Sequence, residues 1–249
     1  MKSTAPAGAR TTMRCMMSVG LLLIACQGCA TQQPADPRDP LESFNRGVFA
    51  FNEGLDKAVL KPVATVYHDL TPQLVRTGVG NFLGNLDDAW SSVNSLLQFK
   101  LRAAVDNFMR FGVNTTFGLF GILDVASEMQ INRHSEDFGQ TLGAWGFGTG
   151  AYLVLPVFGP STFRDTVALP VDFSGDLASH AGDIRTRNSL RVLNVIDTRA
   201  NLLGLSSALD EVALDKYSFT RDAFLQRRRN AVYDGNPPDT DAVTGEATR

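Results

Sequence analysis

The sequence predicts a mainly α-helical protein. Apolar residues recur at spacings of three and four through most of the chain, which is the period of a helix with one buried face. Strand patterns are few: residues 152–157 and 166–171 look extended, and both contain or adjoin proline. With 249 residues, of which 44% are hydrophobic, the chain supports one domain, or at most two, with a hydrophobic core. We place a single helical domain at residues 39–233.

The first 25 residues have the layout of a secretory signal and are excluded from the predicted fold. Three basic residues precede an apolar run over residues 15–25 that is too short to span a membrane comfortably. Cys26 directly follows the small residue that ends this run, which resembles a bacterial lipobox, so we predict lipidation at Cys26. Cys29 is the alternative. Lipidation at Cys29 would place Cys26 at the minus-three position of the lipobox, a poorer fit than Leu23, which takes that position when Cys26 is lipidated.

The cysteine pattern excludes a disulfide framework, because no cysteine occurs in the last 220 residues. A pair between Cys26 and Cys29, or two plain apolar cysteines, is the alternative to lipidation. Each buried methylene group of an acyl chain contributes about 0.8 kcal/mol, so more than one chain anchors a protein stably. No Asp follows either cysteine, and we therefore expect sorting to the outer membrane.

Both ends of the domain are flanked by polar segments. Residues 26–38 predict a flexible tether, polar and proline-rich from residue 31, and residues 234–249, rich in Pro, Asp and Thr, predict a disordered tail. Without the first 25 residues the chain carries 20 basic and 26 acidic side chains, a net charge of about −6. That balance argues against a nucleic-acid partner.

The predicted domain opens with a helix that starts at Asp39. This residue is a candidate N-cap, Pro40 takes the first helical position, and Glu42 lies three residues after the cap. The apolar face that follows consists of Leu41, Phe44, Val48, Phe51 and Leu55. We expect an amphipathic helix with an aromatic-rich face.

Three more helices are predicted before the middle of the chain. Thr71 and Pro72 start one that continues to Phe82, and the carboxylates Asp87 and Asp88 precede the next. The second of these helices has its apolar residues at Trp90, Val93, Leu96 and Leu97. The third has them at Leu101, Val105, Phe108 and Phe111. Each set has helical spacing.

Two helices are predicted in the C-terminal part of the domain. The first covers residues 192–203, where Val192, Ile196 and Leu203 recur at helical spacing. The second runs from about residue 209 to 233 and ends with the basic run 227–229. Basic side chains near a helix C-terminus are favoured by the helix dipole.

Two segments differ from ordinary surface helices. Residues 111–123 are uncharged, but 13 residues of helix span only about 20 Å, less than a hydrocarbon core of about 30 Å. Residues 138–163 contain no Asp, Glu, Lys or Arg, yet their glycines and prolines oppose one continuous helix. Two interpretations stay open: backbone held inside or at the edge of a bilayer, with Trp145 and Tyr152 at its interface, or a buried loop of a soluble protein.

No catalytic, metal or cofactor site is predicted. The glycine-rich run 146–150 lacks the lysine of a phosphate-binding loop and the strand-then-helix setting of a dinucleotide site. The three histidines lie far apart, and we expect each to be a surface or capping residue rather than a zinc ligand. No G-x-S-x-G motif occurs. The adjacent carboxylates Asp87-Asp88 and Glu136-Asp137 could form acid-base pairs, but neighbouring residues do not face each other on a helix, and a helix start explains Asp87 and Asp88.

Several separate motifs follow one another through residues 39–233. They are residues 39–46 (DPLESFNR), Asn81-Phe82 with Asn85-Leu86, Arg110-Phe111 with Asn114-Thr115, residues 121–126 (GILDVA), residues 137–143 (DFGQTLG), Leu155-Pro156 and Arg164-Asp165. In this order behind a lipobox, they resemble the MlaA (VacJ) family of Gram-negative outer-membrane lipoproteins. The resemblance gives Cys26 the anchoring role and makes residues 138–160 the channel-forming region.

The resemblance implies an all-α, ring-shaped, membrane-embedded lipoprotein in the periplasmic leaflet of the outer membrane, with a Gly-rich irregular channel segment. It implies a protein without catalytic cofactor that is not an enzyme. Such proteins take mislocalised phospholipids from the outer leaflet through an amphipathic channel. The implied partners are trimeric porins and a soluble periplasmic lipid carrier.

A lipid headgroup needs a polar path past hydrocarbon. The candidate residues of this path are Gln140, Thr141, Gly143, Trp145, Gly146, Phe147, Gly148, Thr149 and Gly150. Arginine at the mouth would attract the headgroup, and Arg110, Arg133 and Arg164 are the candidates. Two other functions stay open, a structural lipoprotein that docks on a porin and a periplasmic phospholipase.

Overall fold

The computed structural model describes residues 36–238. The predicted signal, both candidate lipidation sites (Cys26 and Cys29) and most of the predicted tether lie outside the described residues, as does the tail beyond residue 238. Arg38–Arg249 forms a compact unit distinct from Met1–Pro37, and the following description concerns its residues 38–238.

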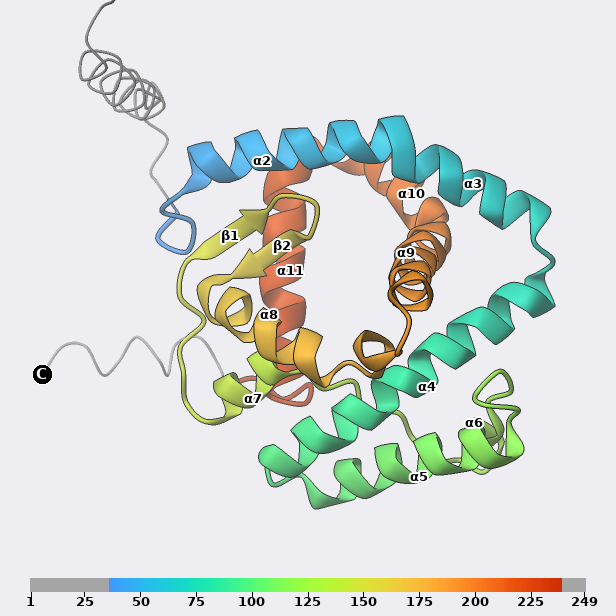
Figure 1. The fold of residues 1–249 in the computed structure, drawn as a ribbon. Helices are drawn as coiled ribbons and strands as arrows, with labels where there is room; N and C mark the ends of the chain where they lie inside the picture. Colours follow the sequence, from blue (N-terminus) through green and yellow to red (C-terminus); the bar gives the residue numbers. More distant parts are fainter. Residues whose placement is uncertain (1–35, 239–249) are drawn as a thin grey trace, which may run out of the picture. The chain divides into compact units, whose positions relative to one another are not determined.

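Helices form nearly all of this unit, and Figure 1 shows them following one another around a ring. The first half contains α2 (Glu42–Leu55), the π-helical turn η1 (Asp56–Leu60), α3 (Lys61–Leu70), α4 (Gln73–Leu97), α5 (Leu101–Phe117) and α6 (Val125–Glu128). The second half contains α7 (Phe138–Ala144), strands β1 (Tyr152–Leu155) and β2 (Gly159–Thr162), α8 (Phe163–Gly175), the 3₁₀ turn η2 (Leu177–His180), α9 (Ile184–Asn201), α10 (Leu203–Val212) and α11 (Lys216–Val232). The mainly helical prediction is confirmed, and the hairpin corrects the all-α class.

Two helix starts differ from the prediction because tertiary contacts use the residues that resemble caps. Asp39 is buried and accepts a hydrogen bond from the Tyr217 hydroxyl, so α2 begins three residues later without a side-chain cap. Asp87 and Asp88 lie inside α4, which is 25 residues long and continues past them without a break. The Asp88 carboxylate is buried beside the Arg110 guanidinium, at 3.3 Å, and this pairing replaces a capping role.

The C-terminal half departs from the prediction in two places. Residues 166–171 belong to α8 instead of a strand, because the Thr162 side chain caps this helix and Pro170 is accommodated within it. The predicted last helix is two helices, α10 and α11. They are separated at Asp215, whose carboxylate accepts two backbone N–H groups of the first turn of α11. A side-chain cap of this kind starts a new helix at a position that periodicity alone does not indicate.

The strands β1 and β2 form one antiparallel hairpin, so the extended stretch predicted at residues 152–157 is a strand in its first four residues. The edge of β1 away from β2 is bonded by two asparagine side chains of α2. The contacts are Asn45 with the backbone of Tyr152 and Val154, and Asn52 with the backbone of Leu155 and Val157. These amides satisfy strand-edge groups that would otherwise lack partners, and they fix the hairpin to α2.

The interior of the unit is polar for a folded chain. Tyr152, Val154 and Tyr217 form an apolar cluster under the hairpin, so Tyr152 lies in the core and not at an interface. The largest fully buried side chains elsewhere include Arg110 and the asparagines Asn45, Asn85, Asn94, Asn107 and Asn114. Large apolar side chains lie outside instead, with Leu74 87% and Phe99 85% exposed. This arrangement is the reverse of the usual pattern in soluble proteins.

Candidate functional site

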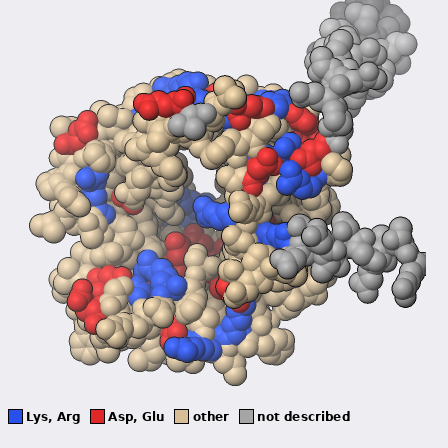
Figure 2. Space-filling view, turned by 180° about the vertical axis from the view of Figure 1, so that it is seen from behind, with Lys and Arg blue, Asp and Glu red and all other residues tan. Residues whose placement is uncertain are grey.

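The middle of the unit is open. Figure 2 shows this opening, with side chains of both charge signs on its wall. Charged side chains need water or an opposite charge close by, so the wall of the opening is polar. No helix within residues 36–238 is long and apolar enough to cross a membrane.

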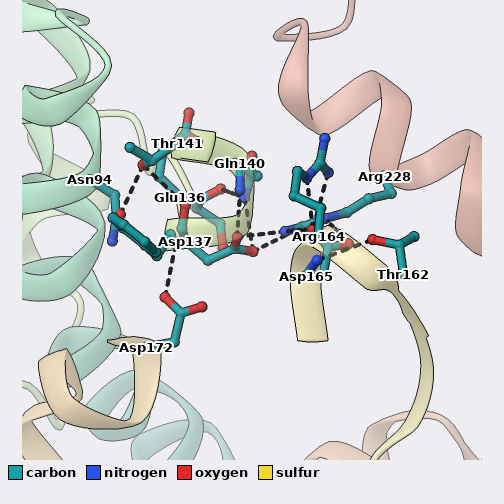
Figure 3. A network of polar contacts seen from close by, with 12 residues as sticks. Asn94, Glu136, Asp137, Gln140, Thr141, Thr162, Arg164, Asp165, Asp172 and Arg228 are labelled. Carbon is teal, nitrogen blue, oxygen red and sulfur yellow. Dashed lines mark hydrogen bonds and ion pairs between the residues drawn. The ribbon is translucent and has the colours of Figure 1, made fainter. Parts of the chain in front are cut away.

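A partly buried charge network joins α7, α8 and α11 (Figure 3). The Arg228 guanidinium of α11 donates to the Asp137 carboxylate at 2.5 and 2.6 Å and to the Asp165 carboxylate at 2.8 and 2.9 Å. Arg164 of α8 also donates to Asp165, at 3.0 Å. Asp137 in turn caps α7 by accepting the backbone N–H of Gln140. The network therefore fixes the start of the glycine-rich segment to two other helices.

The charges of this network are balanced. Burial by itself would raise the pKa of Asp137, but the hydrogen bonds and charge of Arg228 outweigh burial and hold that pKa below its usual value. Burial likewise opposes the charge on Arg228, and the Asp137 and Asp165 carboxylates overcome it and raise the pKa of Arg228. Two arginines face two carboxylates, so the removal of one partner leaves a buried charge without compensation.

Sequence reasoning does not find Arg228 as a member of this network. The run 227–229 fits the basic end of a helix, and only its middle residue turns inward to Asp137. The signal that would identify Arg228 is its helix face. Phe224 and Val232 lie four residues before and after it, so Arg228 stands on the helix face that carries these apolar side chains.

Most of the predicted path residues lie around a cavity beside this network. Gly143, Gly146, Phe147, Gly148 and Thr149 line a cavity of 160 Å³, together with Arg164 and Arg228. Of the three arginines expected at a channel mouth, Arg164 is thus next to the glycine-rich segment. Arg110, by contrast, is fully buried between carboxylates, and Arg133 pairs with Asp88 at 2.8 Å.

The remaining predicted path residues have other surroundings. Thr141 is fully buried and its hydroxyl donates to Asn94 at 2.9 Å. Gln140 lines a second cavity, of 200 Å³, which also contacts Arg228. The Trp145 indole N–H donates to a carbonyl of α4, and a side chain at Gly150 would meet Phe163.

The polar residues that gave rise to other hypotheses have structural partners. The His68 and His134 rings each lie beside a carboxylate, and the His180 ring contacts the backbone carbonyl of Asp176. No group of three potential metal-ligating side chains occurs among residues 36–238. Glu136 accepts hydrogen bonds from Lys100 and from Gln98, which leaves it in a structural role.

The exposed surface carries many large apolar side chains. Those more than half exposed on α2, α4, α5 and the loop after α5 include Phe44, Phe51, Leu74, Phe108, Phe117, Leu119 and Phe120. Exposed apolar area of this extent marks a surface that contacts a membrane or another protein. A polar opening inside and apolar side chains outside are the two features that any function must explain.

Three comparisons identify the relatives of this chain. Residues 37–231 match the family described as MlaA lipoprotein. The intermembrane phospholipid transport system lipoprotein MlaA of Escherichia coli K12 is 36% identical over 216 residues, which are 83% of this chain and 82% of that protein. The protein of the same name from Haemophilus influenzae is 33% identical over 225 residues, 86% of this chain and 89% of that protein.

A solved structure extends this similarity to the fold. It is described as "Structural basis for maintenance of bacterial outer membrane lipid asymmetry" and has a TM-score of 0.70 with this chain at 35% identity. The match covers 80% of this chain and 99% of that chain. The resemblance carried by the sequence motifs is therefore confirmed, and the chain belongs to the MlaA lipoprotein family, a family of transport lipoproteins rather than of enzymes.

Proposed function

We propose that this chain takes mislocalised phospholipids from the outer leaflet of the outer membrane and passes them to a soluble periplasmic carrier. The curated relatives from E. coli and H. influenzae are named as intermembrane phospholipid transport lipoproteins, which supports lipid as the cargo. The observation that carries the proposal is the reversed distribution of polarity, with arginine and asparagine buried inside and phenylalanine and leucine exposed outside. A protein that carries charged headgroups through hydrocarbon needs this distribution.

The opening in the unit is the proposed path for the headgroup. A phosphate group inside hydrocarbon is costly, whereas guanidinium groups bind phosphate strongly and with defined geometry. Arg164 lines the cavity beside the glycine-rich segment, and its Nη1 has no hydrogen-bond partner in the part of the chain that the structure describes. Arg228 holds this segment in place, because its donors are committed to Asp137 and Asp165.

The exposed apolar side chains are the proposed membrane contact. Acyl chains on Cys26 would hold the protein at the periplasmic leaflet, and the apolar surface would lie among lipid tails or against a trimeric porin. Outer-leaflet lipids then reach the opening without a membrane-crossing helix. The proposed activity is transfer without bond cleavage, so no nucleophile or metal ion takes part.

A substitution at Gly148 tests the path most cleanly. Both Gly146 and Gly148 line the cavity, but Gly146 has φ +91°, a backbone conformation that strains any larger residue. Gly148 has no such strain, and a Cβ added there would meet nothing within 4 Å. Gly148→Phe therefore narrows the cavity without a clash at the backbone. Gly182→Phe is the matched control, since Gly182 has equally open surroundings in the loop before α9.

The measurement is the amount of phospholipid in the outer leaflet of a Gram-negative strain that lacks the gene, together with its detergent sensitivity. We expect surface phospholipid to rise in that strain, and expression of the wild-type chain or Gly182→Phe to reverse the rise. Gly148→Phe should fail to do so at equal protein level. A normal outer leaflet in the deletion strain would refute lipid transfer. Full rescue by Gly148→Phe with retained porin binding would favour a scaffold, and release of fatty acid by the purified chain would favour a phospholipase.

A further inference from the structure

A second cavity lies away from the glycine-rich segment, between α3, α4, α9 and α10. It is a groove of 780 Å³, and none of its lining residues is acidic. The lining residues that carry or can carry positive charge are Lys61, His68 and Arg76, and hydroxyl or amide groups come from Thr65, Thr77 and Asn81. A groove with this composition favours a negatively charged ligand.

Among the described residues, two of the three basic side chains of this groove have no acidic partner, whereas the third, His68, lies 3.0 Å from the Asp69 carboxylate. Lys61 and Arg76 make no ion pair with any residue of the range 36–238. The Nε atom of Arg76 is buried and lacks a hydrogen-bond acceptor. A buried donor without a protein partner is costly, so this position favours a ligand that supplies an acceptor.

The carboxylates around the groove are already engaged. Asp197 accepts hydrogen bonds from the Tyr67 hydroxyl at 2.9 Å and from the Asn201 amide at 3.2 Å. Asp210 pairs with Lys216 at 2.5 Å. Neither carboxylate therefore neutralises Arg76 or Lys61 by direct contact, and the groove keeps an excess of positive charge although the whole chain is acidic.

We propose that this groove binds the phosphate of a phosphodiester or phosphate ester, with the Arg76 guanidinium as its main donor. Arginine and lysine with flanking hydroxyl and amide donors form the usual chemistry of a phosphate site. At the corner between α3 and α4, next to the groove residue Gln73, Leu70 is 78% and Leu74 87% exposed. Apolar side chains beside a cationic groove suit a lipid headgroup at a membrane surface, while the same donors suit a free phosphate. The inference rests on the groove itself and not on the proposed transport path.

Binding by the purified full chain tests this proposal with three probes: inorganic phosphate and glycerophosphoglycerol, with the chain in nonionic detergent, and vesicles of phosphatidylglycerol, to which the chain is added by dilution below the critical micelle concentration. The variants are Arg76→Gln and Lys61→Gln. Arg102→Gln is the matched control, because its side chain is 91% exposed and it loses the same charge. Since a hydrogen bond to a charged group contributes about 1.5–3 kcal/mol, Arg76→Gln should weaken binding about tenfold or more. Lys61→Gln should weaken it less, and Arg102→Gln should leave it unchanged.

The three probes separate the sources of the phosphate. Weaker binding of Arg76→Gln to glycerophosphoglycerol and to vesicles supports a lipid headgroup. Weaker binding to inorganic phosphate alone supports a free phosphate. The proposal is overturned if Arg76→Gln and Lys61→Gln both match Arg102→Gln with all three probes while their helix content by circular dichroism equals that of the wild type. Neither Arg76 nor Lys61 lines the cavity beside Gly148, so a negative result here concerns the groove alone and is distinguishable from failure of the transport path.

Discussion

Replacement of Arg228 by methionine tests the charge network directly. Methionine keeps much of the side-chain length but removes four hydrogen bonds to Asp137 and Asp165. The two carboxylates then retain only Gln140 and Arg164 as side-chain partners. The loss of one partner of a fully buried ion pair costs about 3–5 kcal/mol. Because the Asp137 side chain is 36% exposed and partly screened by solvent, we expect a destabilisation at the lower end, about 3 kcal/mol. At about 2–4 °C per kcal/mol, the melting temperature should fall by roughly 6–12 °C.

The same variant has a defined pH dependence. Arg228 holds the pKa of Asp137 below its unfolded value, so the stabilisation is present above about pH 3.9 and is lost as the pH falls through the folded pKa. In Arg228→Met this pKa rises, since burial is then opposed only by weaker contacts. The stability difference between wild type and variant should therefore be largest near neutral pH and should shrink below about pH 4.

Denaturation of the detergent-solubilised chain, followed by circular dichroism at pH 7 and pH 3.5, gives both quantities. Arg102→Met is the control, because its side chain is 91% exposed and surface substitutions usually change stability by no more than about 0.5 kcal/mol. The triple change Arg228→Met, Asp137→Asn and Asp165→Asn should recover part of the loss, since no buried charge then lacks a partner at these positions. A loss below about 1 kcal/mol for Arg228→Met would refute the reasoning.

Three further predictions use the same stability measurement. Arg110→Met should cost about 3–5 kcal/mol, because this fully buried guanidinium pairs with two carboxylates; a cost near that of a surface change would contradict its structural role. Gly121→Ala should destabilise by about 1 kcal/mol or more, since Gly121 has φ +96° and a Cβ would lie 2.7 Å from Asn85. By contrast, Gly112→Ala should stabilise by about 0.5–1 kcal/mol, because Gly112 lies within α5 and a Cβ there would meet nothing within 4 Å. Desolvation by the surrounding protein atoms, although the side chain stays exposed to solvent, and the neighbouring carboxylates Asp176 and Asp88 raise the pKa of Asp87 to about 6. The stability that the protonated form contributes should therefore be lost as the pH rises from about 4 to 6, and Asp87→Asn should flatten that loss; a carboxyl titration near pH 4 by NMR would rule this out.

Most helices of this protein can be predicted from its sequence. The spacing of Leu101, Val105 and Phe108 predicts α5 with its observed start, because the periodicity of an apolar face is a local property, even where that face is exposed as it is here. Periodicity does not predict the short helix α7, which the Asp137 side chain caps. The order of the sequence motifs identifies the family, since many positions contribute to it independently.

Tertiary structure decided the roles of the charged residues. Asp39 and Asp88 resemble helix caps in sequence, where a cap contributes about 1 kcal/mol, but each is buried beside a partner from another helix. In the sequence, Arg228 resembles the basic residues that the helix dipole favours near a helix C-terminus. Its partners Asp137 and Asp165, however, lie 91 and 63 residues away. Helical periodicity and family membership can be read from the sequence, because those signals are local or add up along the chain. Only the fold decided which charges are buried together, since the several kcal/mol of a buried ion pair outweigh local preferences and depend on residues that the sequence keeps far apart.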